Sequence, residues 1–180
     1  TGENKLLHNS YNIAGVGRNK SGGLTVGTWE GVQLWNSDDD FVWLHQGEIE
    51  GNPIKLNDVM PGPGGSLFGG SGHLDSCAVF RFNTDGSVDI VDEGLELCNG
   101  MGFSPDLTTF YSTDSPKHEI YKWDHNPNTG EISNKRVFAT IPSDWGIPDG
   151  MTVDAEGFDT LRWSEGALPE DTTQIILGDT

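Results

Sequence analysis

A repeat of short segments with the composition of β-strands constrains the fold of this chain more than any other feature. One series consists of runs that end in Asn or Asp, namely VQLWN (32–36), VFRFN (79–83), IYKWD (120–124) and IILGD (175–179). A second series precedes it, namely GGLTVGTW (22–29), GGSLFGGS (64–71), DLTTFYSTDS (106–115) and EGFDTLRW (156–163). The first series starts at intervals of 47, 41 and 55 residues, and the second keeps step with it. This agreement indicates four copies of one structural unit.

The residues inside each unit favour β-strands. The runs are rich in Val, Ile, Thr, Phe and Trp, and turn sequences such as NTDG (83–86) and NPNTG (126–130) separate them. No apolar period of 3.6 residues is long enough to predict a helix. Units of about 40–50 residues with about four strands each are typical of a β-propeller. We therefore predict an all-β chain that forms a single propeller domain over residues 1–180.

The repeat also predicts where the blades divide. We expect about four blade units, at approximately 10–50, 51–95, 96–142 and 143–180. The segment NKLLHN (4–9) has no unit of its own. Propellers commonly close by pairing a terminal strand with the blade from the other end of the chain, which removes exposed edges. We expect residues 4–9 to complete the last blade, within the chain or in a partner, and we expect self-association to cover open blade edges.

Charge and apolar runs narrow the classes of partner. The net charge of −18 argues against nucleic-acid binding, because so acidic a surface repels phosphate backbones. The longest apolar runs span only a few residues, and the first residues contain no secretory apolar segment, so we expect a soluble chain with no membrane partner. The cytoplasm is the favoured compartment, and secretion is the alternative.

Cys77 and Cys98 belong to no CxxC motif, so we expect two free buried thiols, with one disulfide as the alternative.

Three polar residues recur at the spacing of the repeat. Asn57, Asn99 and Asp149 each precede a strand-like run, and they lie 42 and 50 residues apart. The innermost strand of each blade lines the central channel, so residues at the same place in successive blades converge on one spot. Amide and carboxylate oxygens suit Ca²⁺, Mg²⁺ or Mn²⁺. Asp58 adds a second carboxylate ligand or a hydrogen bond that orients one of the ligands.

Each of these residues alone also has a simpler interpretation. Asn-Gly, Asn-Asp and Pro-Asp-Gly are common turn sequences, so the site is predicted from the set and not from one member. The stretch DHNPNTGEISNK (124–135) imitates a calcium loop, but its Gly falls one place late and Lys135 stands where a bidentate Glu is needed. We predict a hairpin turn there. The five histidines show no HxH or HExxH pairing, and no GxSxG motif occurs.

Four stretches resemble one family in order and spacing. They are NDVMPGPGGSLFGGS (57–71), CNGMGFSPDLTTFYSTDS (98–115), TGEISNKRVF (129–138) and IPDGMTVDAEG (147–157). They resemble the senescence marker protein/gluconolactonase family, which includes regucalcin, bacterial gluconolactonases and luciferin-regenerating enzymes. The resemblance implies a six-bladed propeller with one divalent metal in the central channel. It also implies hydrolysis of a lactone or a related ester as the activity.

The resemblance assigns roles to particular residues. Asn99 and Asp149 fall on two protein metal ligands, and Asn57 falls on an asparagine near the substrate or the metal, followed by Asp58 as in the family. Lys55 stands where members often have a substrate-binding arginine. Asp149 would also accept a proton from the attacking water, and Ca²⁺ is the favoured ion, with Mg²⁺, Mn²⁺ or Zn²⁺ as alternatives. Trp145 would form a wall of the substrate pocket.

Parts of the family pattern have no counterpart in this sequence. The family's third metal ligand is a glutamate in the first blade, and the last blades have no match after Gly157, so the chain resembles four blades of a six-blade pattern. Two functions therefore follow from the sequence. The first is a divalent-metal-dependent hydrolase of a lactone or ester. The alternative is a catalytically inactive propeller remnant that binds a small ligand or a partner chain.

Overall fold

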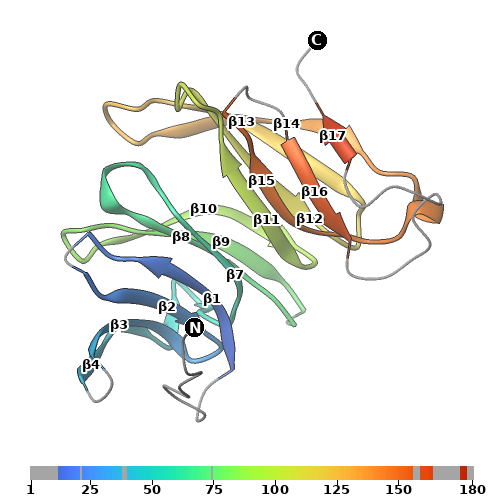
Figure 1. Cartoon of the computed structure of the whole chain (residues 1–180). Coiled ribbons are helices and arrows are strands. Elements are labelled where there is room, and N and C mark those ends of the chain that lie inside the picture. Colours follow the sequence, from blue (N-terminus) through green and yellow to red (C-terminus); the bar gives the residue numbers. More distant parts are fainter. Residues whose placement is uncertain are drawn as a thin grey trace, which may run out of the picture.

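Four antiparallel sheets follow one another along the chain. The computed structural model describes residues 12–20, 22–37, 40–73, 75–155, 159–163 and 175–177. Figure 1 shows the sheets side by side in chain order, from blue to red. In each sheet, consecutive strands are hydrogen-bonded neighbours. This meander of repeated sheets is the propeller blade that the sequence predicts, so the predicted fold class is confirmed.

The strand bounds follow the repeat. The first sheet contains β1 (Ile13–Arg18), β2 (Leu24–Thr28), β3 (Gly31–Ser37) and β4 (Asp40–Gln46). The second contains β7 (Leu56–Pro61), β8 (Leu67–Ser71), β9 (Cys77–Phe82) and β10 (Val88–Leu95). The third contains β11 (Cys98–Phe103), β12 (Thr109–Asp114), β13 (Glu119–His125) and β14 (Ile132–Thr140). The fourth contains β15 (Pro148–Val153), β16 (Asp159–Trp163) and β17 (Ile175–Leu177).

The remaining described elements are short. A two-stranded hairpin, β5 (Glu48–Ile49) with β6 (Asn52–Pro53), connects the first two sheets, and 3₁₀ turns lie at η1 (Pro63–Gly65) and η2 (Ser143–Trp145). Within the described part of the chain, no helix is long and apolar enough to cross a membrane. The segment predicted to close the last blade, residues 4–9, lies outside the described residues.

Strand β9 shows how the sequence builds the core. Successive side chains of a strand point to opposite faces of the sheet. Cys77 and Val79 accordingly join the apolar cluster between the second and third sheets, whereas Ala78, Phe80 and Phe82 join the cluster between the first and second sheets. All five are buried, because the second sheet is covered on both faces. Each fully buried Phe or Val contributes about 1.5–3 kcal/mol to folding.

The first strands of the sheets form the inner wall. Strand β1 lies against β7, β7 lies against β11, and β11 lies against β15. These inner strands begin at one end of the sheets, which we call the site end, and finish at the opposite end, which we call the far end. The hairpin turn predicted from DHNPNTG joins β13 to β14 at the far end. Because the inner strands lie side by side, the residues at their beginnings lie close together at the site end.

Candidate functional site

Asn57, Asn99 and Asp149 occupy the same place in three neighbouring blades. Each is the second residue of an inner strand, in β7, β11 and β15 respectively. Asn99 is buried, with 7% of its surface exposed, and the other two are half-buried. The repeat spacing in the sequence thus corresponds to a shared position at the site end.

A direct hydrogen bond joins two of the three side chains. The Asn57 Nδ2 donates to Asn99 Oδ1 at 2.8 Å and to the carbonyl oxygen of Cys98 at 3.1 Å. A carbonyl oxygen can only accept, so the Asn57 amide must turn its nitrogen toward β11. This orientation makes the Asn99 oxygen an acceptor that faces the neighbouring blade.

Ser115 fixes the orientation of Asn99 from the other side. Asn99 Nδ2 donates to Ser115 Oγ at 2.8 Å, and that hydroxyl donates in turn to the carbonyl oxygen of Pro148 at 2.5 Å. Because the hydroxyl proton is given to a carbonyl, the serine oxygen must accept from the amide. Ser115 has no exposed surface. The chain of bonds therefore runs from Asn57 through Asn99 and Ser115 to the residue that precedes Asp149.

Two carboxylates lie at the same end. Burial raises the pKa of Asp58 to about 6, and the negative charge of Asp149 acts in the same direction. The Val59 N–H donates to Asp58 Oδ1 at 2.8 Å, which opposes this rise. Both carboxylates are half-buried. The site end thus contains two acidic groups that are close enough to repel each other.

Glycines let the inner strands approach. A Cβ on Gly100 would lie 2.6 Å from the Cβ of Met151 and 2.7 Å from the carbonyl oxygen of Asp149. A Cβ on Gly72 would lie 2.7 Å from the Cβ of Asn57. Real Cβ atoms do not come this close, so a larger residue at either position would displace a strand that carries a site residue.

The remaining predicted residues take different positions. Lys55 precedes β7, and its ammonium group lies 4.5 Å from the centre of the Trp29 ring and donates to the carbonyl oxygen of His73 at 3.2 Å. Trp145 ends the turn η2 and packs half-buried beside the apolar pair of Ile120 and Ile141. The role of Trp145 in substrate binding stays a prediction.

The donor atoms suit a hard divalent cation. Carboxylate oxygens from Asp58 and Asp149 and amide oxygens from Asn57 and Asn99 are the groups that Ca²⁺ and Mg²⁺ prefer. The fixed oxygen of Asn99 and the mutual repulsion of the two carboxylates both favour a positive charge between them. In the described ranges, no group of three or more His, Cys, Asp or Glu side chains could hold a metal ion. The side chains at the site end thus offer amide and carboxylate oxygens as ligands.

Both cysteines are buried thiols that form no disulfide with each other, as the sequence predicts. Burial raises the pKa of the Cys98 thiol far above its ordinary value, and Cys77 acts in the same direction. A buried thiol that stays protonated is a poor nucleophile. Cys98 serves the site through its carbonyl oxygen, which accepts from Asn57.

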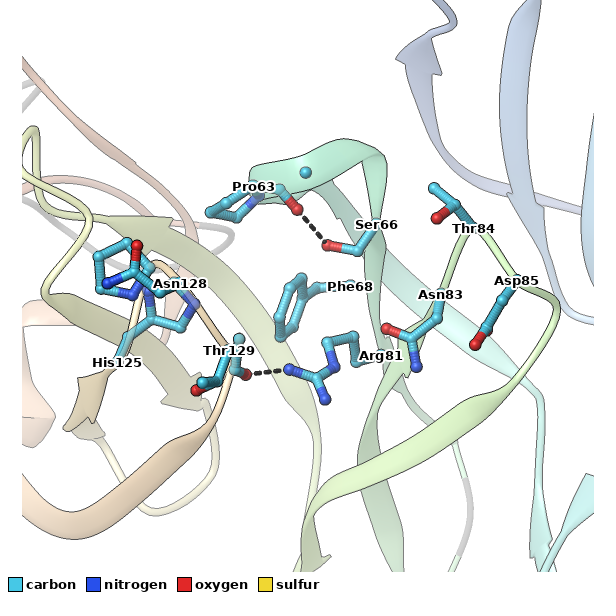
Figure 2. Close-up of a pocket in the computed structure, with 13 residues that line it drawn as sticks. Pro63, Ser66, Phe68, Arg81, Asn83, Thr84, Asp85, His125, Asn128 and Thr129 are labelled. Atoms are coloured by element: carbon cyan, nitrogen blue, oxygen red, sulfur yellow. Dashed lines mark hydrogen bonds between the residues drawn. The ribbon is translucent and has the colours of Figure 1, made fainter.

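A hollow at the far end has a different character. Figure 2 shows this pocket of about 440 Å³, with His125, Asn128 and Thr129 on one side and Asn83, Thr84 and Asp85 on the other. Arg81 lies between them, and it donates to Asp89 and to the carbonyl oxygen of Gly130. Asn83 also donates to Asp89. The cation and this amide are thus engaged within the protein, and the bond from Arg81 to Gly130 joins the second sheet to the turn between β13 and β14 of the third.

Sequence reasoning did not identify Ser115, Trp29 or His73. Each of the three contacts residues from another strand or another blade. These partners do not occupy the same place in successive repeat units, so the repeat does not reveal the contacts. The signal for Ser115 would have been the demand of Asn99 for a hydrogen-bond acceptor. That demand is visible only once β12 and β11 are paired.

A β-propeller with amide and carboxylate oxygens at one end of its inner strands is the class that these observations define. The model of the family described as the SMP-30/Gluconolactonase/LRE-like region matches residues 1–164. The chain therefore belongs to this family. The predicted family resemblance is confirmed.

Named relatives extend the comparison. The pentonolactonase XacC of Haloferax volcanii is 37% identical over 125 residues, which cover 68% of this chain and 43% of that protein. Regucalcin of Homo sapiens is 28% identical over 156 residues, covering 81% of this chain and 52% of the relative. The chain thus spans about half the length of the curated relatives it matches.

Solved structures share the fold. The calcium-binding protein regucalcin of Agrobacterium tumefaciens has a TM-score of 0.76 at 22% identity, over 88% of this chain and 56% of that chain. A gluconolactonase of Xanthomonas campestris has a TM-score of 0.72 at 22% identity, over 86% of this chain and 57% of that chain. At this level of identity the likeness concerns the propeller alone.

Proposed function

We propose that this chain carries the site of a divalent-metal-dependent hydrolase that acts on a lactone or a related ester. The observation that carries the proposal is the shared position of Asn57, Asn99 and Asp149 at the beginning of three inner strands. Their side chains would supply oxygen ligands to a cation at the site end. The names of relatives, among them a pentonolactonase and a gluconolactonase, support a lactone as the substrate.

The roles of the residues follow from their chemistry. Asn99 and Asp149 would hold the cation, with Ca²⁺ favoured because a structural relative is described as a calcium-binding protein. When bound, the cation would polarise the lactone carbonyl and stabilise the charge that develops on its oxygen. Asp149 takes a proton from the attacking water, and Asn57 and Lys55 orient the hydroxyl groups of the substrate.

The test is lactone hydrolysis by the purified protein after removal of metals with a chelator and re-addition of Ca²⁺, Mg²⁺ or Mn²⁺. We expect proton release from a sugar lactone that depends on the added ion. The Asp149→Ala variant should lower kcat/KM by about 100-fold or more, because it removes both a ligand and a base. Asp144→Ala, which removes an exposed carboxylate in η2, is the matched control and should leave the rate unchanged. Full metal-dependent activity in Asp149→Ala would overturn the assignment.

One observation favours a second candidate function. Asp58 and Asp149 are the two carboxylates of the described part of the site, and the described ranges contain no group of three or more His, Cys, Asp or Glu side chains that could hold a metal ion. A propeller with so few charged ligands could bind a small ligand without hydrolysing it. Saturable binding of a sugar lactone with no proton release at any metal concentration would favour this second function.

A further inference from the structure

Three side chains form a corner beside the proposed site. Trp29 lies in the turn between β2 and β3, Lys55 precedes β7, and His73 follows β8. The Lys55 ammonium lies 4.5 Å from the centre of the Trp29 ring and donates to the His73 carbonyl oxygen at 3.2 Å. The Trp29 and His73 rings are 5.5 Å apart between centres and tilted by 48°. We call this set the Lys55 corner.

The Lys55 corner is adjacent to Asn57. The Gly72 N–H donates to the Lys55 carbonyl oxygen at 2.9 Å, and a Cβ on Gly72 would touch the Cβ of Asn57. His73 directly follows Gly72, and Lys55 precedes Asn57 by two residues. A substrate that contacts Asn57 with one part therefore has the corner within reach of its next atoms.

The charge of Lys55 is not neutralised by a carboxylate among the described residues. The basic residues Arg81, Lys117, Lys135 and Arg136 each pair with an aspartate. Lys55 is instead held by a neutral carbonyl and an aromatic face. An ammonium group has three N–H donors, and a carbonyl and a ring occupy only part of this capacity. In a chain with a net charge of −18, the corner is a local positive group at the site end.

The corner is also exposed to solvent. Trp29 is 40% exposed, and His73 is exposed with its backbone at a φ of 59°, a left-handed conformation that is uncommon for a residue other than glycine. This conformation holds the His73 carbonyl toward Lys55. An ammonium whose position is fixed before binding loses less side-chain entropy when it contacts a ligand.

We propose that the Lys55 corner accepts a carboxylate carried by the substrate, so that acid-sugar lactones are preferred over neutral sugar lactones. This inference rests on the proposed lactone hydrolysis at the same site. The carboxylate would take the free N–H donors of Lys55, while the Trp29 ring packs against the carbon chain that carries it. Trp29 and Lys55 thereby determine specificity.

The experiment uses two probes that differ in one group, galactaro-γ-lactone with a terminal carboxylate and galactono-γ-lactone with a terminal hydroxymethyl group. We expect wild-type protein to hydrolyse the acid lactone with a kcat/KM about tenfold higher, and the preference should decline as salt is raised, because screening weakens exposed charge pairs. Lys55→Gln should abolish the preference, because it raises KM for the acid lactone more than it raises KM for the neutral lactone. Trp29→Leu should reduce it in the same way. Lys20→Gln, at an exposed lysine of the far-end loop, is the control.

Each outcome decides one of the two claims. Equal kcat/KM for both lactones in the wild-type protein, or an equal loss for both in Lys55→Gln, would overturn the carboxylate assignment while leaving lactone hydrolysis intact. If neither lactone is hydrolysed, the proposed function fails. Calorimetric binding of galactarate and galactitol then tests the corner by itself, since wild-type protein should bind galactarate more tightly and Lys55→Gln should not. Equal binding of galactarate and galactitol would overturn the proposal that the Lys55 corner binds a carboxylate.

Discussion

Asn99 has its side-chain orientation fixed at both ends of its amide. Its amide nitrogen is bonded to Ser115 and its oxygen to Asn57, so the side chain cannot flip without breaking both bonds. Mutation of a residue that orients a metal ligand through a hydrogen bond typically lowers metal affinity by about 10–100-fold. Ser115 is therefore a positioning residue for the proposed metal site.

Removal of the Ser115 hydroxyl should weaken cation binding. We expect Ser115→Ala to lower the calorimetric affinity for Ca²⁺ by about tenfold or more, because Asn99 loses the acceptor that sets its orientation. Ser104→Ala, which removes a hydroxyl from the far-end turn of the same sheet, is the control. A fall in melting temperature with unchanged affinity would assign Ser115 a purely structural role.

The two cysteines should be chemically silent in the folded protein. Cys77 and Cys98 are buried, and the raised pKa of Cys98 keeps its thiol protonated. We expect no labelling by a thiol reagent at pH about 8 under native conditions and two labels per chain in denaturant, read by mass spectrometry. Rapid labelling of native protein would contradict the described burial.

At the level of single residues, the repeat predicted which side chains of neighbouring blades lie together, whereas their roles stay predictions. Asn57 and Asn99 could be paired because their separation equals one blade, and the structure brings their side chains into contact. Trp29 and His73 could not be found, because their contact depends on how two turns from different blades meet. No periodic feature of the sequence predicts the contact between these two turns.

At the level of elements, the spacing of the inner strands decides whether the site can form. Strands β11 and β15 approach through Gly100, which faces backbone atoms of the neighbouring blade. The repeat and turn sequences predicted where strands occur, but not which glycine faces a neighbouring backbone. That information comes only from the register between blades.

Two glycines of one strand provide a matched comparison. Gly100→Ala should destabilise the protein by about 1–3 kcal/mol, because the new methyl group would meet the backbone of Asp149 and Met151. Gly102→Ala should cost less, since its new methyl meets a methyl group of the Val153 side chain and not the backbone of the neighbouring blade. Denaturant unfolding measures both variants. Equal stability of the two would show that β11 and β15 do not approach as described.

At the scale of the whole molecule, the described sheets follow one another as successive blades, and the first sheet has exposed apolar residues. Ile13, Val16, Val42 and Leu44 on β1 and β4 are each about half exposed. These residues lie on the two edge strands of this sheet, and exposed apolar side chains favour association because burial removes them from water. The fold class was predictable because one unit recurs along the chain. Assembly was not predictable in the same way, because it depends on which side chains are exposed on the folded surface, and the repeat does not determine them.

Self-association is therefore our expectation for the chain in solution. Light scattering at increasing protein concentration should give a mass above that of a monomer. Val16→Ser with Val42→Ser should shift this mass toward the monomer, since both exposed apolar groups become polar. A strictly monomeric wild-type protein over the same concentrations would contradict the expectation.

The central claim is that the beginning of the inner strands binds a divalent cation, and calorimetric titration with Ca²⁺ tests it most directly. We predict saturable binding to the metal-free wild-type protein with a Kd below about 1 mM, which corresponds to about 4 kcal/mol. Asp149→Asn should weaken it by about tenfold or more, because a charged ligand is replaced by a neutral one. Absence of binding to the wild-type protein at millimolar Ca²⁺, Mg²⁺ and Mn²⁺ would contradict the account.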